Sequence, residues 1–361
     1  MNASGFLFVV CQYGAEEALK RELARQSLPL RLAFSRPGFV TFKLPADVAP
    51  PDFELRSVFA RTYGFSLGKV EGTLAQTLAA AVWDLACTGP YHQLHAWQRD
   101  TAIPGERGFE PGLTELANEV GQIIAAAAPA GAAARADLPV NHNARSGDRV
   151  LDCVLVETNR WWIGWHRALT LPQRWPGGTP KIALPPDAVS RAYLKMTEAL
   201  LWSQLPVAAG DHAVEIGSAP GGSCQALLDR GLYVTGVDPA DMDDTVLAHP
   251  RFTHVRARAA SLKRQAFAEM QWLFADANVA PQHTLETVEH IVTNQRVRIR
   301  GLLLTLKLPE WKLADEIPSY LDRIRAWGYT YLRVRQLAFN RQEVCVAALR
   351  SRSLRRTARG G

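Results

Sequence analysis

The spacing of hydrophobic and polar residues divides the chain into two patterned regions. In the first 170 residues, short apolar runs that predict strands alternate with amphipathic stretches that predict helices. The predicted strands cover residues 6–11, 30–34, 38–44, 93–97, 150–157 and 161–167, and the predicted helices cover residues 15–26, 73–86 and 113–127. Strands and helices mixed in this way predict one or two small α+β units.

A proline-rich stretch, residues 171–186, separates this region from the rest and has the composition of a linker. Asp187 is an N-cap candidate for an amphipathic helix that runs to about residue 205. The predicted strands that follow cover residues 212–216, 232–238, 272–275, 301–306, 331–338 and 343–349, with helices at 223–230, 284–295 and 314–327. Repeated strand–helix alternation predicts a doubly wound, mostly parallel sheet over residues 187–350, followed by a basic tail at 351–361.

The strand at residues 212–216 leads into the glycine-rich turn Gly217-Ser-Ala-Pro-Gly-Gly222. Such a turn places free backbone N–H groups at a helix N-terminus, and Asp238 at the end of the next strand can accept hydrogen bonds from ribose hydroxyls. The turn therefore predicts a nucleoside-cofactor site, although a tight turn without a ligand is the simpler interpretation. Its glycines do not follow the G-x-G-x-x-G spacing that admits a pyrophosphate, which favours S-adenosylmethionine over NAD.

Composition narrows the class of protein. With 361 residues and 47% hydrophobic content, the chain can build two domains with cores of their own. Its five cysteines include no C-x-x-C pair, which argues against a disulfide framework and a zinc site and favours a reducing cytoplasm. The nine histidines show no metal-ligand spacing, because His92 and His95 alone make no site, so no metal is expected.

The apolar segments are too short or too interrupted to span a membrane. Residues 6–10 form a short apolar run, and the alanine-rich stretch 123–136 contains Pro129, Gly131 and Arg135. We therefore expect a soluble cytoplasmic protein with no membrane partner.

Charge is distributed unevenly along the chain. Residues 1–250 carry 21 lysines and arginines against 26 acidic residues, whereas residues 251–361 carry 20 against nine. A basic third that follows a cofactor loop suggests a polyanionic substrate such as RNA, although a solvated charged face is the alternative.

Polar residues follow the predicted parallel strands where ligands bind in open α/β sheets: Asp238, Asp276 and Lys307. Lys307 directly follows the apolar run 302–306, where loss of hydration favours the neutral amine and so a general base. A lysine that reaches from a strand end to solvent is the alternative for Lys307, and a turn cap is the alternative for Asp276.

Together these residues resemble the FtsJ-type RNA ribose 2′-O-methyltransferases. The matching set is Ser190-Arg-x-x-Leu-Lys195, Gly217-Ser-Ala-Pro-Gly-Gly222, Asp238, Asp276, Leu306-Lys-Leu-Pro309 and Arg341-Gln-Glu-Val344. The resemblance implies a catalytic tetrad of Lys195, Asp276, Lys307 and Glu343. It implies that the residues binding S-adenosylmethionine are Ser190, Gly217, Ala219, Pro220, Gly221, Gly222, Asp238 and Asp276.

The resemblance also implies a fold and a substrate. It predicts a Rossmann-like class I methyltransferase domain at residues 187–350, preceded by a ferredoxin-like and THUMP-like RNA-binding region at residues 1–170. The implied substrate is large-subunit rRNA, with a cytidine ribose as the expected target and no metal required. A noncatalytic RNA-binding ribosome assembly factor that keeps the fold is the main alternative, a nicotinamide-dependent oxidoreductase is a weaker one, and the oligomeric state stays open.

Overall fold

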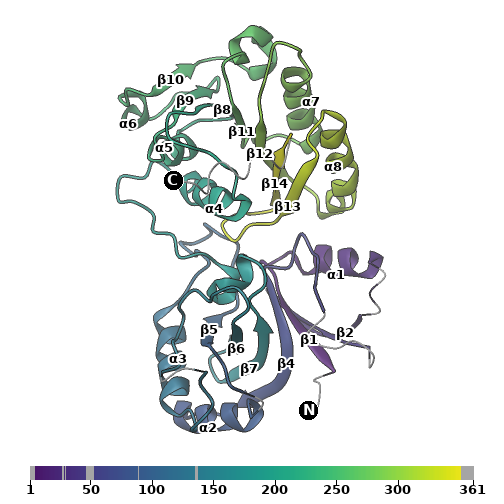
Figure 1. Cartoon of the computed structure of the whole chain (residues 1–361), viewed down its shortest axis with the longest axis vertical. Helices are drawn as coiled ribbons and strands as arrows, with labels where there is room; N and C mark the ends of the chain where they lie inside the picture. Colours follow the sequence, from purple (N-terminus) through teal and green to yellow (C-terminus); the bar gives the residue numbers. More distant parts are fainter. Residues whose placement is uncertain are drawn as a thin grey trace. The chain divides into compact units, whose positions relative to one another are not determined.

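The computed structural model describes residues 5–26, 28, 30–45, 53–87, 89–134 and 137–350, so the predicted basic tail at 351–361 lies outside the described residues. The chain splits into two compact units, Met1–Lys181 and Ile182–Gly361 (Figure 1). The division falls inside the proline-rich stretch. Among the described residues, no helix is long and apolar enough to cross a membrane.

The first unit contains one seven-stranded sheet with the strand order β2-β3-β1-β4-β7-β6-β5. Its elements are β1 (Phe6–Val10), α1 (Glu16–Arg25), β2 (Arg31–Arg36), β3 (Phe39–Lys43), β4 (Thr62–Glu71), α2 (Ala75–Leu85), β5 (Gln93–Gln98), α3 (Glu115–Ala126), β6 (Arg149–Glu157) and β7 (Arg160–Arg167). Two short 3-10 helices follow, η2 (Pro172–Arg174) and η3 (Pro176–Gly178). All neighbouring strands are antiparallel except β5 and β6, which are parallel.

Strand β4 is the strand of the first unit that the hydrophobic pattern does not predict. Tyr63, Phe65 and Leu67 alternate with smaller or polar residues, but Gly64 and Gly68 are poor strand formers and a register shift between Ser66 and Gly68 breaks the alternation. In the structure β4 pairs with both β1 and β7. It thereby joins the predicted small units into a single continuous sheet.

Aromatic residues pack within the first unit. Trp161 is 1% exposed, and Trp162 stacks on Phe34 with ring centroids 5.7 Å apart. Trp161 and Trp162 therefore pack against other parts of this unit. All residues from 172 to 178 are buried as well except Arg174, so this segment packs into the first unit and does not form an open linker.

The second unit contains the doubly wound sheet, with the strand order β10-β9-β8-β11-β12-β14-β13. Its elements are α4 (Ala192–Ser203), β8 (His212–Ile216), α5 (Gly222–Leu228), β9 (Tyr233–Val237), α6 (Asp244–Leu247), β10 (Phe252–Val255), η4 (Ala259–Ser261), η5 (Arg264–Phe267), β11 (Trp272–Ala275), α7 (Pro281–Val292), β12 (Gly301–Lys307), η6 (Trp311–Glu316), α8 (Ile317–Ala326), β13 (Tyr331–Arg335) and β14 (Glu343–Leu349). Strand β14 is antiparallel to both β12 and β13, and the other neighbouring strands are parallel.

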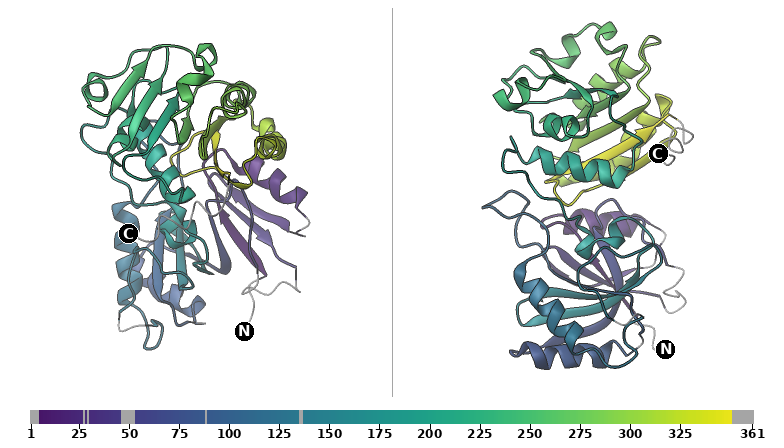
Figure 2. Two further views of the ribbon diagram at one scale, coloured as in Figure 1. Left: turned by 45° about the horizontal axis from the view of Figure 1, so that its top comes forward. Right: turned by 60° about the vertical axis from the view of Figure 1, so that its left-hand side comes forward.

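The strand order places a switch point between β8 and β11. The chain moves outward from β8 to β9 and β10, and then returns to β11 and proceeds in the opposite direction. Because crossovers between parallel strands are right-handed, α5 and α7 lie on opposite faces of the sheet, with α4 beside α5 and α8 beside α7 (Figure 2). Ligands bind at the carboxyl ends of the strands on either side of such a switch point.

Helix α4 begins at Ala192, and the prediction that Asp187 caps its N-terminus is wrong. The side chain of Gln225 on α5 explains the difference, because it donates to the carbonyl of Asp187 at 3.2 Å and accepts from the N–H of Val189 at 3.0 Å. These bonds hold the preceding segment in a turn against α5, so the helix starts four residues later than predicted.

Candidate active site

The four residues of the predicted tetrad come from four elements and meet at one edge of the second sheet. Lys195 lies on α4, Asp276 directly follows β11, Lys307 ends β12 and Glu343 begins β14. The carboxyl ends of parallel strands share an edge, and the antiparallel strand β14 starts there. The register then pairs Lys307 directly with Glu343.

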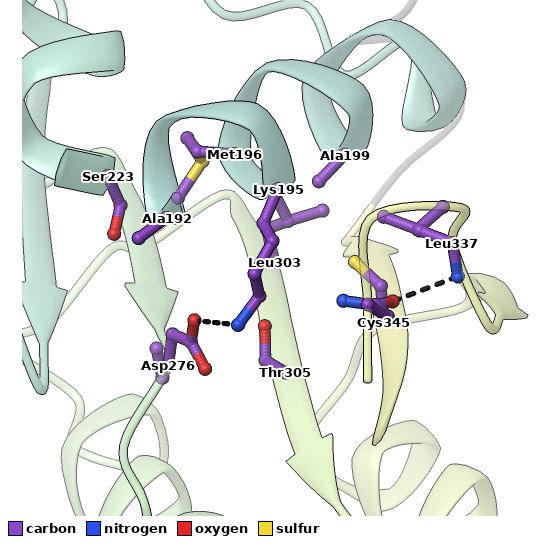
Figure 3. A pocket seen from close by; sticks show the side chains of 12 residues that line it. Ala192, Lys195, Met196, Ala199, Ser223, Asp276, Leu303, Thr305, Leu337 and Cys345 are labelled. Carbon is purple, nitrogen blue, oxygen red and sulfur yellow. Dashed lines mark hydrogen bonds and ion pairs between the residues drawn. The ribbon is translucent and has the colours of Figure 1, made fainter. Parts of the chain in front are cut away.

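The four side chains form a closed ring of ion pairs in which positive and negative groups alternate. Nζ of Lys195 lies 2.9 Å from Oε1 of Glu343 and also contacts Oδ2 of Asp276. Nζ of Lys307 lies 2.7 Å from Oδ1 of Asp276 and also contacts Oε2 of Glu343. Each carboxylate thus uses its two oxygens for two different lysines. Figure 3 shows Lys195 extending from α4 to Asp276.

Burial makes these charges depend on one another. The side chain of Glu343 is 4% exposed and that of Lys195 is 12% exposed. Burial alone would raise the pKa of Glu343, but the charges of Lys195 and Lys307 outweigh it and lower the pKa to about 2. For Lys195, burial would lower the pKa, but Asp276 and Glu343 outweigh it and raise the pKa above its ordinary value. Lys195 therefore stays charged at neutral pH.

Two residues that the sequence interpretation missed hold Glu343 and its loop in place. Asn340 is 1% exposed and donates to Oε1 of Glu343 at 3.1 Å. Glu198, one helical turn after Lys195 on α4, accepts from the backbone N–H groups of Ala338 and Phe339 at 2.8 and 2.9 Å. The signal that could have found Glu198 is an acidic residue on the apolar face of a predicted helix.

A small pocket lies between α4 and the sheet beside Lys195 and Asp276 (Figure 3). Most of its lining is apolar; it comprises Ala192, Lys195, Met196, Ala199, Ser223, Ala275, Asp276, Leu303, Thr305, Leu337, Asn340 and Cys345. These apolar side chains limit contact with water, which strengthens electrostatic interactions within the ring.

Glu215 is a second titratable residue that the sequence interpretation missed. It lies on β8 and is fully buried. Burial and the charge of Asp276 raise the pKa of its carboxyl group to about 8, while the Ser223 hydroxyl and Lys195 oppose the shift. The carboxyl group is therefore mostly protonated and uncharged at neutral pH.

The glycines of the loop at residues 217–222 are required by the close approach of other parts of the chain. At Gly217, with φ of 77°, an added Cβ would lie 2.7 Å from Cα of Ala277. At Gly221, with φ of 126°, it would lie 2.7 Å from Val246, and at Gly222 it would lie 2.2 Å from Oγ of Ser190. Ser190 thus lies against the loop, which is where a residue that binds the same ligand as the loop would have to lie.

Asp238 links the loop to the end of β9. Its Oδ2 accepts from the N–H of Ala219 at 3.1 Å, and its Oδ1 accepts from the N–H of Ala240 at 2.8 Å. A carboxylate has about four lone-pair sites, so these two bonds leave capacity for ribose hydroxyls. Pro220 is exposed at the tip of the loop, whereas Gly221 and Gly222 are buried.

The loop and the tetrad are neighbours. The N–H of Asp276 donates to the carbonyl of Ile216 at 3.0 Å, and Ala277 packs against Gly217. A ligand held by the loop at the end of β8 therefore lies next to the tetrad at the ends of β11 and β12. This adjacency suits a reaction between a bound cofactor and a second substrate.

The strand order and the glycine loop define the second unit as a Rossmann-like domain of the methyltransferase type. The sequence profile described as FtsJ-like methyltransferase matches residues 188–317, so this unit contains an FtsJ-like methyltransferase domain.

Curated relatives match about half of the chain. The chain is 31% identical over 186 residues to "Ribosomal RNA large subunit methyltransferase M" of Halorhodospira halophila, covering 50% of this chain and 53% of the relative. It is 31% identical over 181 residues to the protein of the same name from Azoarcus sp., covering 47% and 48%. The chain thus spans about half the length of the curated relatives it matches.

Among solved structures, TrmN from Thermus thermophilus aligns with 95% of this chain and 99% of that chain, at 14% identity and a TM-score of 0.34.

Proposed function

We propose that this protein is an S-adenosylmethionine-dependent ribose 2′-O-methyltransferase that acts on large-subunit rRNA, with a cytidine as its target. The observation that carries the proposal is the closed ring of Lys195, Asp276, Lys307 and Glu343 beside the glycine loop. The names of the curated relatives support large-subunit rRNA as the substrate.

The cofactor fits the residues at the ends of β8 and β9. S-adenosylmethionine supplies an activated methyl group on its sulfonium sulfur. The loop at 217–222, together with Ser190, would hold the cofactor against the sheet edge, and Asp238 has acceptor capacity left for its ribose hydroxyls. Asp276 would contact both the cofactor side of the site and the lysines.

The tetrad would prepare the ribose hydroxyl of the RNA. A 2′-hydroxyl is a weak nucleophile until its proton leaves. Once Lys307 has released one of its own protons to solvent, its neutral Nζ would accept the hydroxyl proton as a new O–CH₃ bond replaces the S–CH₃ bond and the sulfonium becomes a neutral thioether. Lys307 is the more exposed of the two lysines, at 21% against 12%. Lys195, held charged by its two carboxylates, would orient the ribose oxygen, and Glu343 would hold both lysines.

One further feature of the sequence supports an RNA substrate. The basic third of the chain, residues 251–361, would attract the phosphate backbone. The first unit would serve as the ferredoxin-like and THUMP-like RNA-binding region, which would bring the target nucleotide to the second unit. With such a substrate we expect the protein to act in the cytoplasm.

The alternative function is that of a ribosome assembly factor that binds RNA without catalysis. The ring disfavours it, because burying two lysines and two carboxylates costs solvation energy that an apolar cluster of similar size would not. A site that has no reaction to perform has no physical need for this arrangement.

A transfer assay tests the proposal. The wild-type protein would be incubated with labelled S-adenosylmethionine and large-subunit rRNA that lacks ribose methylation, beside Lys307→Ala and Lys312→Ala. Lys312 is 72% exposed and serves as the matched control. We expect label on a cytidine 2′-oxygen for the wild type and Lys312→Ala, and a loss of at least about 100-fold for Lys307→Ala. Label on a base, or equal activity of Lys307→Ala, would contradict the proposal.

Absence of transfer would separate the two functions. If the wild-type protein bound both RNA and S-adenosylhomocysteine yet transferred no methyl group to rRNA, ribosomal particles or tRNA, the assembly factor would be the better interpretation.

A further inference from the structure

The first unit contains a buried cluster of two histidines and one aspartate. His95 lies on β5, Asp152 on β6 and His166 on β7, which are neighbouring strands. His95 is directly opposite Asp152 in the register, and His166 is opposite Val150, two residues before Asp152. Since side chains alternate between faces along a strand, the three residues share one face. They are 0%, 0% and 2% exposed.

Backbone carbonyl groups determine which ring nitrogen of each histidine carries a proton. Nε2 of His95 lies 2.9 Å from the carbonyl oxygen of His142, and Nε2 of His166 lies 2.8 Å from that of Gln173. A carbonyl oxygen can only accept, so each Nε2 must be the donor. In the neutral rings, both Nδ1 atoms are then left with a free lone pair.

These lone pairs converge on the carboxylate. Nδ1 of His166 lies 2.6 Å from Oδ2 of Asp152. Among the described residues, Nδ1 of His95 and Oδ1 of Asp152 have no hydrogen-bonding partner, although both are buried. One ligand atom from each of the three residues lies within 4.8 Å of the others. Three acceptors gathered in a buried site require a positive group between them.

We propose that His95, Asp152 and His166 bind a divalent metal ion, Zn²⁺, through the two Nδ1 atoms and the carboxylate. Two imidazoles and a carboxylate are ordinary ligands for Zn²⁺, with a fourth position left for water. Metal-bound histidines usually donate their other N–H to a backbone carbonyl or carboxylate, and both histidines already do so here.

The role of this metal would be structural. The outer hydrogen bonds connect the site to the carbonyls of His142, in a loop, and of Gln173, in η2, both outside the sheet. An ion at the cluster would therefore fasten both segments to β5, β6 and β7. Sequence spacing did not predict it, because the three ligands come from three strands and no two of them form a short motif.

The test uses the full chain carrying no histidine tag. Zinc content would be measured by mass spectrometry after purification without chelator. The protein would then be stripped with a chelator and titrated with Co²⁺, whose visible absorption reports coordination by nitrogen and oxygen ligands. We expect about one zinc ion per chain, a cobalt spectrum that zinc abolishes, and a lower melting temperature after stripping.

Variants locate the site. We expect His95→Gln and Asp152→Asn to weaken zinc binding by at least about tenfold, and His283→Gln, which changes a 71% exposed histidine of the second unit, to bind like the wild type. The overturning result is measured on the wild type, so it does not depend on whether a variant folds. If the wild type contains no metal and the stripped protein gives no cobalt spectrum, then a proton between His166 and Asp152, with a buried water on the remaining acceptors, occupies the cluster instead.

Discussion

Lys307 and Glu343 face each other across β12 and β14 as register partners, and their side chains form one of the four contacts that close the ring. The same antiparallel pairing that completes the sheet therefore places a candidate base beside the carboxylate that balances it. The backbone register, and not a flexible loop, sets this spacing.

Replacing Glu343 by glutamine removes one negative charge from the buried ring. We expect Glu343→Gln to lower the free energy of unfolding by about 3–5 kcal/mol at neutral pH, because two lysines then share one carboxylate. Chemical denaturation of the wild type and the variant measures the difference. Glu310→Gln, which changes a 63% exposed carboxylate paired with Lys312, is the control and should unfold like the wild type.

The difference in unfolding free energy between the wild type and Glu343→Gln should also depend on pH. The pKa of Glu343 lies at about 2, below its usual value of 4.5, so the unfolded chain binds a proton first as the pH falls. The ionised carboxylate of Glu343 stabilises the folded chain fully above pH 4.5, and this stabilisation is lost as the pH falls from 4.5 to about 2. The gap in unfolding free energy between the wild type and Glu343→Gln should therefore narrow over this window. A gap that stays constant down to pH of about 3 would contradict the pKa assignment.

For Glu215 we expect the opposite dependence of stability on pH. Its raised pKa, about 8 instead of 4.5, means that the folded chain keeps a proton that the unfolded chain releases. The contribution of the protonated group is complete below pH 4.5 and is lost as the pH rises through about 8. We expect Glu215→Gln to gain thermal stability relative to the wild type on moving from pH of about 5 to about 9. Glu286→Gln, which changes an exposed carboxylate, is the control and should show no such gain in thermal stability.

Glu198 should act as a positioning residue. Its carboxylate accepts from the N–H groups of Ala338 and Phe339, and an amide at this position presents an N–H₂ group to one of those donors. We expect Glu198→Gln to lower the free energy of unfolding by about 1–3 kcal/mol. Methyl transfer should fall with little change in affinity for S-adenosylhomocysteine, because the displaced loop carries Asn340 and leads into Glu343. Equal losses of transfer and cofactor affinity would contradict a role confined to this loop.

Comparing alanine variants of two glycines with similar φ angles distinguishes the effect of a steric clash from the effect of backbone strain. Gly217 and Gly210 have φ of 77° and 86°, but an added Cβ meets the backbone of Ala277 only at Gly217 and meets nothing within 4 Å at Gly210. Both Gly→Ala variants should lose about 1 kcal/mol of stability from the left-handed conformation. We expect only Gly217→Ala to weaken binding of S-adenosylhomocysteine as well, by at least about tenfold, as measured by calorimetry. Unchanged affinity of Gly217→Ala would place the cofactor elsewhere.

Local sequence patterns predicted much of this protein. Apolar runs with a period of two or 3.6 residues predict most strands and helices of the second unit, although they miss the short elements α6 and β10. The side chains that follow the strands at Asp238, Asp276 and Lys307 are visible without coordinates. The topology of parallel strands then indicates that these residues share one edge. Such features are local in sequence, so the sequence alone sufficed for them.

Features that depend on contacts between distant segments required the tertiary structure. Strand β4 contains two glycines and a register shift between Ser66 and Gly68 that breaks its apolar alternation, so only its pairing with β1 and β7 shows that the first unit has one sheet. The start of α4 depends on hydrogen bonds from Gln225 of α5.

The contacts within the two polar clusters also required the tertiary structure. The sequence indicated which residues could form the tetrad, but strand register and the crossing of α4 decided that each carboxylate bridges both lysines. The convergence of His95, Asp152 and His166 likewise results from pairing among β5, β6 and β7. Burial and partner geometry arise only when the sheet assembles, because they depend on residues far apart along the chain.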